Sequence, residues 1–194
     1  MREIHTVFVH CSASDKAEHD DIAVIRTWHL ARNFDDVGYH YFIQGNGKVQ
    51  TGRSLERIPA AQHGFNTGTI AVCLHGLTTF SEAQFRELRS LIHTLEIYAR
   101  KKLRVRGHCE VDAHKTCPVF DYRKVLDLDE KGFIKRNALT ERAESLFQQA
   151  AFAYEKGRYL TWLPWDMLSP YAQEQWMGAV AATLNETKKG ATDA

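Results

Sequence analysis

Three residues with metal-binding side chains stand far apart in the sequence, and together they could hold one catalytic ion. His10 ends the apolar run VFVH, whereas His108 and Cys117 come much later in the chain. Imidazole nitrogen and thiolate sulfur are common zinc ligands, and a site with three protein ligands keeps a fourth position open. Zinc in such an open site can make water a nucleophile at neutral pH. If the three side chains converge, we predict a hydrolase that uses one Zn2+ ion.

Two residues in the loop between His108 and Cys117 could replace either of them as ligands. Cys109 directly follows His108, and His114 stands three positions before Cys117, a spacing at which both could bind one ion in a turn. The sequence does not fix the path of this loop. Both alternatives therefore stay open at this point.

The two histidine ligands end segments that have the composition of β-strands. Residues 4–10 alternate in character, residues 103–108 form a short β-rich segment, and their last residues are His10 and His108. The run 69–75 is almost wholly apolar, which is typical of a central strand covered on both faces. Because α/β proteins place their sites at strand ends beside loops, we expect the ligands to meet there.

Helical patterns alternate with these strands, and one hairpin interrupts the alternation. An aspartate caps a predicted helix that ends near residue 32, and a capping box opens a second predicted helix over 81–100. Between them, residues 38–53 predict an antiparallel hairpin with a tight primed turn at Asn46-Gly47. The predicted fold class is α/β: a mixed central β-sheet flanked by helices, with a C-terminal helical appendage.

The composition of the chain changes toward its C-terminal end. All 10 histidines and all 4 cysteines precede residue 118, whereas three of the 4 tryptophans follow residue 160. Two amphipathic patterns in the later part predict helices. We therefore predict a zinc catalytic domain over 1–128 and an α-helical segment of unassigned role over 129–194.

The overall composition is that of a folded protein without strong charge bias. Of the 194 residues, 44% are hydrophobic and 25% are charged, and the formal net charge is +1. Direct binding of nucleic acid through bulk charge is therefore not expected. No apolar stretch reaches the length of a membrane span, and the short N-terminal apolar run has the pattern of a strand rather than a signal peptide. We expect a monomer that is made in the cytoplasm and does not insert into membranes.

Four segments resemble, in order, those of the zinc-dependent N-acetylmuramoyl-L-alanine amidases of type 2. They are VFVHCSAS, DDVGYHYFIQGNGKVQTGR, TIAVCLHG and GHCEVDAHKTCP, and the resemblance covers about residues 4–126. This family includes phage endolysins and peptidoglycan recognition proteins. The resemblance implies one zinc ion held by His10, His108 and Cys117, and cleavage of the amide between N-acetylmuramic acid and L-alanine in peptidoglycan. It favours His108 and Cys117 over their neighbours, although the loop between them is longer than in the phage relatives.

The same resemblance implies roles for four further residues. Tyr39 matches the tyrosine of the family's G-Y-H motif, and Lys115 matches the lysine before the last ligand. Both are predicted catalytic residues: Lys115 stabilises an oxyanion, and Tyr39 orients water or shares its proton. Which of the two accepts a proton stays open. His63 and Asn66 match a loop that borders the substrate groove, so we predict contacts with glycan or peptide, with hydrogen bonding inside the loop as the alternative.

The resemblance implies a phage or prophage endolysin that reaches the cell wall through a holin or a similar route. A bacterial amidase delivered by a secretion apparatus would use the same chemistry. Two hypotheses of other classes compete with these: a peptidoglycan-binding module without catalysis, and a regulator of phage RNA polymerase, a role found among podophage relatives. Non-catalytic family members typically lose the cysteine ligand, and Cys117 is present here.

Overall fold

The structure is a computed structural model that describes residues 2–136. The chain divides into two compact units, Met1–Ile134 and Lys135–Ala194. The first unit runs past residue 128, because Leu128 pairs with Ile134 in an antiparallel bridge and both side chains are buried. The helices predicted after residue 136 lie outside the described residues, and the division at 128/129 stays a prediction.

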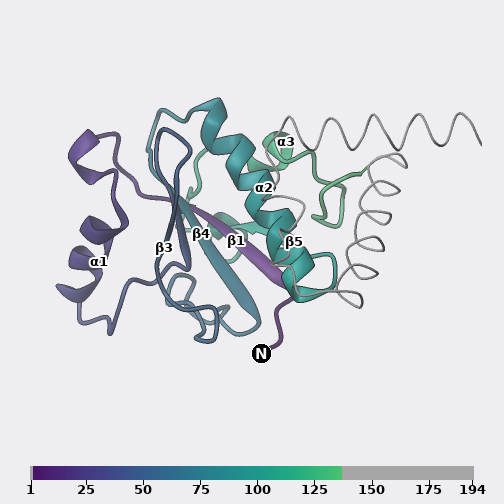
Figure 1. Ribbon diagram of the computed structural model, residues 1–194, viewed down its shortest axis with the longest axis horizontal. Coiled ribbons are helices and arrows are strands. Elements are labelled where there is room, and N and C mark those ends of the chain that lie inside the picture. Colours follow the sequence, from purple (N-terminus) through teal and green to yellow (C-terminus); the bar gives the residue numbers. More distant parts are fainter. Residues whose placement is uncertain (1, 137–194) are drawn as a thin grey trace, which may run out of the picture. The chain divides into compact units, whose positions relative to one another are not determined.

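A mixed five-stranded sheet forms the centre of the first unit, as predicted (Figure 1). The strand order is β3-β2-β4-β1-β5. The central strand β4 pairs in parallel with β1 and β2, β5 is parallel to β1, and β3 is antiparallel to β2. The strands are β1 (Thr6–Cys11), β2 (Tyr41–Ile43), β3 (Val49–Thr51), β4 (Thr69–Leu74) and β5 (Arg104–Gly107).

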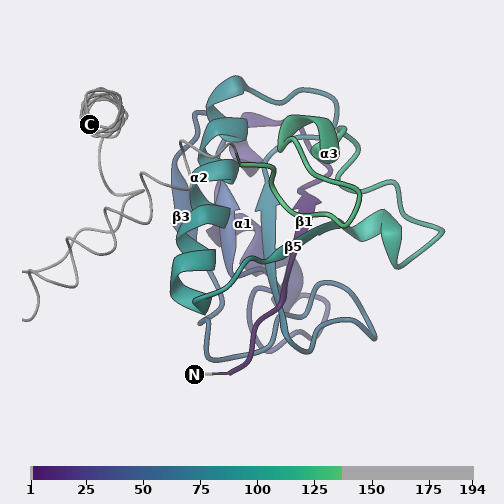
Figure 2. The same cartoon turned by 90° about the vertical axis from the view of Figure 1, so that its right-hand side faces the viewer.

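Helices α1 (Ile22–Leu30) and α2 (Glu82–Ala99) lie on opposite faces of this sheet (Figures 1 and 2). The predicted capping box opens α2, since Ser81 Oγ accepts from the Gln84 amide and Gln84 Oε1 accepts from the Ser81 amide. The remaining short helices are η1 (Ala17–His19), η2 (His108–Glu110) and α3 (Tyr122–Val125). None of the described helices has the length and apolar character needed to span a membrane.

Alternating residues of the central strands build two separate apolar layers. The larger core lies on the α2 side and includes Val9 and Val72 from the strands and Leu88 and Ile92 from the helix. Each such fully buried aliphatic side chain contributes about 1.5–3 kcal/mol. The smaller layer, on the α1 side, contains Ile22, Ile25, Val37, Phe42 and Cys73, with Trp28 and Tyr39 packed against it. His10 is aligned with Cys73 in the parallel register of β1 and β4, which directs its side chain toward this smaller layer.

The hairpin of β2 and β3 is present, but the predicted primed turn at Asn46-Gly47 is wrong. A primed turn of this type needs positive φ at both central residues. In the loop, Gly47 has a φ of 90°, whereas Asn46 is not in the left-handed region. The Gly47 amide donates to the Gln44 carbonyl, and the Asn46 side chain accepts from the Lys48 amide at 2.8 Å. Asn46 thus stabilises a longer loop through its side chain instead of through its backbone.

Candidate metal centre

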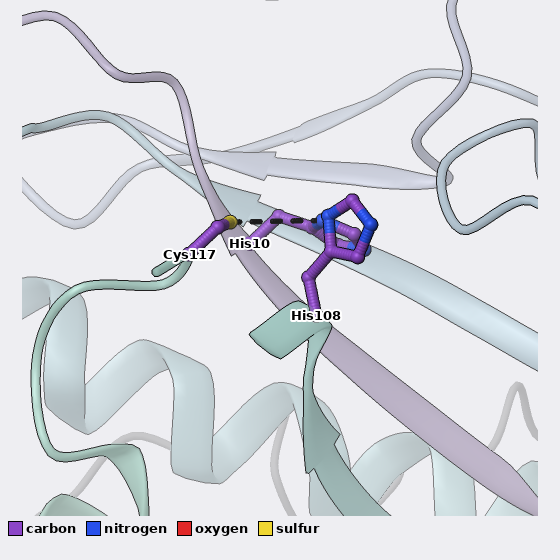
Figure 3. Close-up of side chains that lie close together, drawn as sticks. All are labelled: His10, His108 and Cys117. Carbon is purple, nitrogen blue, oxygen red and sulfur yellow. Dashed lines mark hydrogen bonds between the residues drawn. The ribbon is translucent and has the colours of Figure 1, made fainter. Parts of the chain in front are cut away.

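His10, His108 and Cys117 come from three separate parts of the chain and converge on one point (Figure 3). One potential ligand atom from each residue lies within 4.8 Å of the other two. Cys117 Sγ is 3.8 Å from His10 Nδ1, and the two imidazole centroids are 4.8 Å apart. Zinc–nitrogen and zinc–sulfur bonds of about 2.0–2.3 Å place neighbouring ligand atoms of a tetrahedral ion ~3.3–3.8 Å apart. The donor types and the His10–Cys117 spacing therefore fit one zinc ion, and the other donor atoms, all within 4.8 Å of one another, need to move together by at most about 1 Å to bind it.

Strand pairing explains how ligands so distant in sequence come together. His10 lies in β1, which pairs with β4 along one edge and with β5 along the other. The register of β1 with β5 aligns Val9 with Gly107, so His108, the next residue, emerges beside His10. The Cys109 amide donates to the carbonyl of Cys117 at 2.9 Å. This bond closes the loop between the two residues and places Cys117 next to His108.

The environment of the site keeps both histidines neutral, which is the form that binds metal. Burial, with a smaller contribution from His108, lowers the pKa of His10 to about 3. Burial also lowers the pKa of His108, and the charge of Lys115 adds to this effect. Neither imidazole therefore carries a proton on both nitrogens near neutral pH.

The third ligand, Cys117, contacts a second thiol. Cys11 Sγ lies 3.9 Å from Cys117 Sγ, and the Cys11 amide donates to Cys117 Sγ at 3.2 Å. The hydrogen bond with Cys117 lowers the pKa of Cys11 to about 7, whereas the same contact raises the pKa of Cys117. The Cys11 amide and the Cys11 thiol both donate toward Cys117 Sγ, so this geometry favours a negative charge on Cys117, as would a cation if the two histidines held one.

Tyr39 and Lys115 border the candidate metal centre. The ring of Tyr39, which stands just before β2, has its centroid 5.1 Å from that of His10 and 5.3 Å from that of His29. Burial, and then the neighbouring Cys73 thiol, raises the pKa of Tyr39 well above its usual value. Its hydroxyl is therefore neutral and can donate a hydrogen bond. Lys115 is exposed on the loop after η2, close enough to His108 to influence its pKa.

Neither alternative ligand reaches the site. Within the described part of the chain, the one group of potential ligands that converges consists of His10, His108 and Cys117. The His114 side chain is exposed, and its backbone amide donates to Asp112 Oδ1. Cys109 packs against the larger apolar core.

Of the two predicted substrate-binding residues, Asn66 has a defined role inside its own loop. Its Oδ1 accepts from the amides of Ala61 at 3.2 Å and Gln62 at 3.1 Å. This is the hydrogen bonding within the loop that the sequence left as an alternative. His63 is exposed on the same loop, where a substrate could reach it.

The sequence does not single out Gln62, although this residue contacts a predicted ligand. Gln62 is fully buried, and its Oε1 lies 3.2 Å from His10 Nε2. It lies in the same loop as His63 and Asn66, but the resemblance assigns it no role, and its neighbours give no periodic pattern that would mark it as buried. A fully buried glutamine is uncommon, but burial within a loop is not readable from one sequence.

Comparison with known proteins places this chain in a family. Residues 1–120 match the family described as N-acetylmuramoyl-L-alanine amidase. The endolysin of Escherichia phage T7 is 36% identical over 132 residues, which cover 64% of this chain and 86% of that protein. The endolysin of Klebsiella phage KP32 is 32% identical over 137 residues, covering 66% and 89% respectively.

Solved structures show the same fold at lower identity. The N-acetylmuramoyl-L-alanine amidase LysC from Clostridium intestinale URNW superimposes with a TM-score of 0.57 at 18% identity, covering 65% of this chain and 85% of that chain. Apis mellifera PGRP-SA gives a TM-score of 0.58 at 22% identity, covering 68% and 86%. Because the family match includes more than half of the sequence, the chain belongs to the N-acetylmuramoyl-L-alanine amidase family.

Proposed function

We propose that this chain is a zinc-dependent endolysin, which hydrolyses the amide bond between N-acetylmuramic acid and L-alanine in peptidoglycan. Family membership and the phage endolysin relatives support the reaction and its substrate. The observation that carries the metal requirement is the convergence of His10, His108 and Cys117, with ligand atoms within 4.8 Å of one another. When bound, zinc supplies a Lewis acid that polarises a carbonyl and brings the pKa of water to about 7.

The residues around the metal centre supply the remaining steps. The Lys115 ammonium stabilises the negative charge that develops on the oxygen of the scissile carbonyl. The neutral Tyr39 hydroxyl orients the reacting groups by donating a hydrogen bond, and its raised pKa favours the role of donor over that of base. Exposed His63 contacts the glycan or the stem peptide, whereas Asn66 orders the loop that presents it.

The relatives also support a place of action. Those compared above by sequence are phage endolysins, so we infer that this chain is made inside the infected cell and acts on the wall after release through a holin or a similar route. A binding module without catalysis is disfavoured, since such a module has no need of a complete His-His-Cys ligand set.

Replacement of Cys117 by alanine tests the metal requirement directly. The Cys117→Ala variant should purify without stoichiometric zinc and should fail to lyse cell walls, because two imidazoles alone bind zinc weakly at an open site. Cys109→Ala is the matched control, as it removes a nearby thiol that lies outside the ligand group. Metal analysis and a turbidity assay on purified walls provide the measurements. Full zinc content and lysis in Cys117→Ala would contradict the ligand assignment.

A further inference from the structure

Gln62 lies in the middle of a buried chain of hydrogen bonds that begins at His10. The Gln62 side chain is 0% exposed and that of His10 is 1% exposed. His10 Nε2 lies 3.2 Å from Gln62 Oε1. On its other side, Gln62 Nε2 lies 2.8 Å from Thr69 Oγ1 and 3.4 Å from the carbonyl oxygen of Phe65. The Thr69 hydroxyl in turn donates to the carbonyl of Asn66 at 2.8 Å.

The two distal contacts fix which way the Gln62 amide points. The Phe65 carbonyl can only accept a hydrogen bond. The Thr69 hydroxyl has one proton, which it gives to the Asn66 carbonyl, so it too must accept from Gln62. Both contacts therefore require the NH2 group of Gln62, and its carbonyl oxygen must face His10. If the amide were reversed, the side-chain oxygen of Gln62 would face the carbonyl oxygen of Phe65, and two acceptors would be in contact with no proton between them.

The orientation of Gln62 determines the tautomer of His10. A carbonyl oxygen only accepts, so His10 Nε2 must carry the ring proton and donate it. In a neutral imidazole, the other nitrogen, Nδ1, then holds the free lone pair. Nδ1 is the atom that faces Cys117 Sγ, at 3.8 Å. The lone pair is thus directed into the ligand cluster before any ion arrives.

We propose that Gln62 is a positioning residue of the metal centre: it holds His10 as the Nε2-protonated tautomer and fixes its ring so that Nδ1 binds the ion. The proposal rests on the proposed function, because it presumes that the cluster holds zinc. Metal-binding histidines generally donate their second ring N–H to an acceptor, and loss of that acceptor typically weakens metal binding by ~10–100-fold. Here a neutral amide in a loop supplies the acceptor, and the loop's own carbonyls set its direction.

The variant Gln62→Met tests this role in the full-length protein. Methionine keeps the length and unbranched shape of glutamine but offers His10 no strong acceptor. We expect the zinc dissociation constant, measured by competition with a chelator, to rise ~10–100-fold. Nitrogen-15 spectra of the His10 ring should show a proton on Nε2 in the wild type, both before and after zinc loading. In metal-free Gln62→Met, the two tautomers should become mixed.

Gln84→Met is the matched control, because Gln84 is a second buried glutamine, in α2, whose side-chain amide also donates to backbone carbonyls. Its Nε2 donates to the carbonyls of His75 at 2.7 Å and Ile43 at 3.2 Å, and its side chain is 1% exposed. This variant should lose stability yet keep the wild-type zinc affinity and His10 tautomer. Gln62→Glu is the second variant: its buried carboxyl in the protonated form can accept from His10 with one oxygen and donate to Thr69 or Phe65 with the other. It should bind zinc more tightly than Gln62→Met and keeps the test valid if the methionine variant folds poorly.

The outcomes separate this inference from the proposed function. If wild-type protein binds zinc and Gln62→Met binds it equally well with an unchanged tautomer, the positioning role is overturned and the amidase proposal stands. Equal weakening in Gln62→Met and Gln84→Met would also overturn it, since general destabilisation would then explain the loss. Wild-type protein that binds no zinc would overturn the metal proposal and the role of Gln62 together.

Discussion

Protonation of His40 is expected to destabilise this fold as the pH falls. His40 is buried at 1% exposure, and its Nδ1 accepts from the Ala71 amide at 3.1 Å. Its Nε2 therefore carries the ring proton and donates to the Arg57 carbonyl at 3.0 Å. A second proton would have to sit on Nδ1 against the Ala71 N–H, with the Arg2 guanidinium only 3.2 Å from Nε2. The folded state thus resists the charged form.

The size of the effect follows from the pKa of His40, which burial lowers from 6.5 to about 4. Between these two values the unfolded chain binds the proton and the folded chain does not, so stability rises with pH. Each pKa unit corresponds to about 1.4 kcal/mol, so this residue should remove about 3 kcal/mol of folding free energy as the pH falls from 7 to 4. The contribution is complete above pH 6.5 and is lost progressively below it.

Urea denaturation at several pH values can isolate this contribution when wild-type protein is compared with His40→Asn. Asparagine cannot titrate, and its carbonyl can still accept from Ala71. The variant should be less stable at pH 7, and the gap between the two proteins should narrow by about 3 kcal/mol toward pH 4. All other titrating groups act equally in both proteins and cancel in the difference. A gap that stays constant across this range would refute the reasoning.

Two further predictions concern the residues beside the metal centre. Tyr39→Phe should lower the turnover of purified peptidoglycan by ~10²-fold, because a positioned proton donor contributes about that much. The zinc content should stay unchanged. Turnover at the wild-type rate would contradict a role for the hydroxyl. Lys115→Ala should lower kcat by ~10²–10³-fold through loss of oxyanion stabilisation. A Lys115→Ala effect confined to KM would instead indicate that the lysine only binds substrate.

The sequence predicts the strands that carry the site better than it predicts the turns between them. The apolar run 69–75 and the capping box at Ser81 specify a central strand and a helix through local composition, and both are present. The strand order cannot be predicted from local composition, because it depends on how the connecting helices and loops pack against the sheet. The predicted turn at Asn46-Gly47 is wrong, since Asn46 lacks positive φ, and the loop instead packs against α2, where a Cβ at position 47 would lie 3.1 Å from the Ala83 carbonyl oxygen. That contact is a tertiary effect, which the local sequence does not contain.

The two histidine ligands could be proposed from sequence because each ends a segment with strand composition, whereas Cys117 lies in a loop and is proposed from its side-chain type and the family resemblance. The register of β1 and β5, which makes His10 and His108 neighbours, is seen only in the structure, because strand composition does not say which strands pair. Gln62 could not be found in this way. Its contact with His10 exists only because the 61–66 loop folds back on itself around the Asn66 side chain.

Mass spectrometry of peptidoglycan digested by the zinc-loaded full-length protein tests the proposed reaction most directly. We predict free stem peptides that begin with L-alanine and glycan chains whose N-acetylmuramic acid has lost its peptide. Chelation of the metal should stop their release, and added zinc should restore it. Intact muropeptides, cleavage at another bond, or undiminished release after complete removal of the metal would contradict a zinc-dependent amidase.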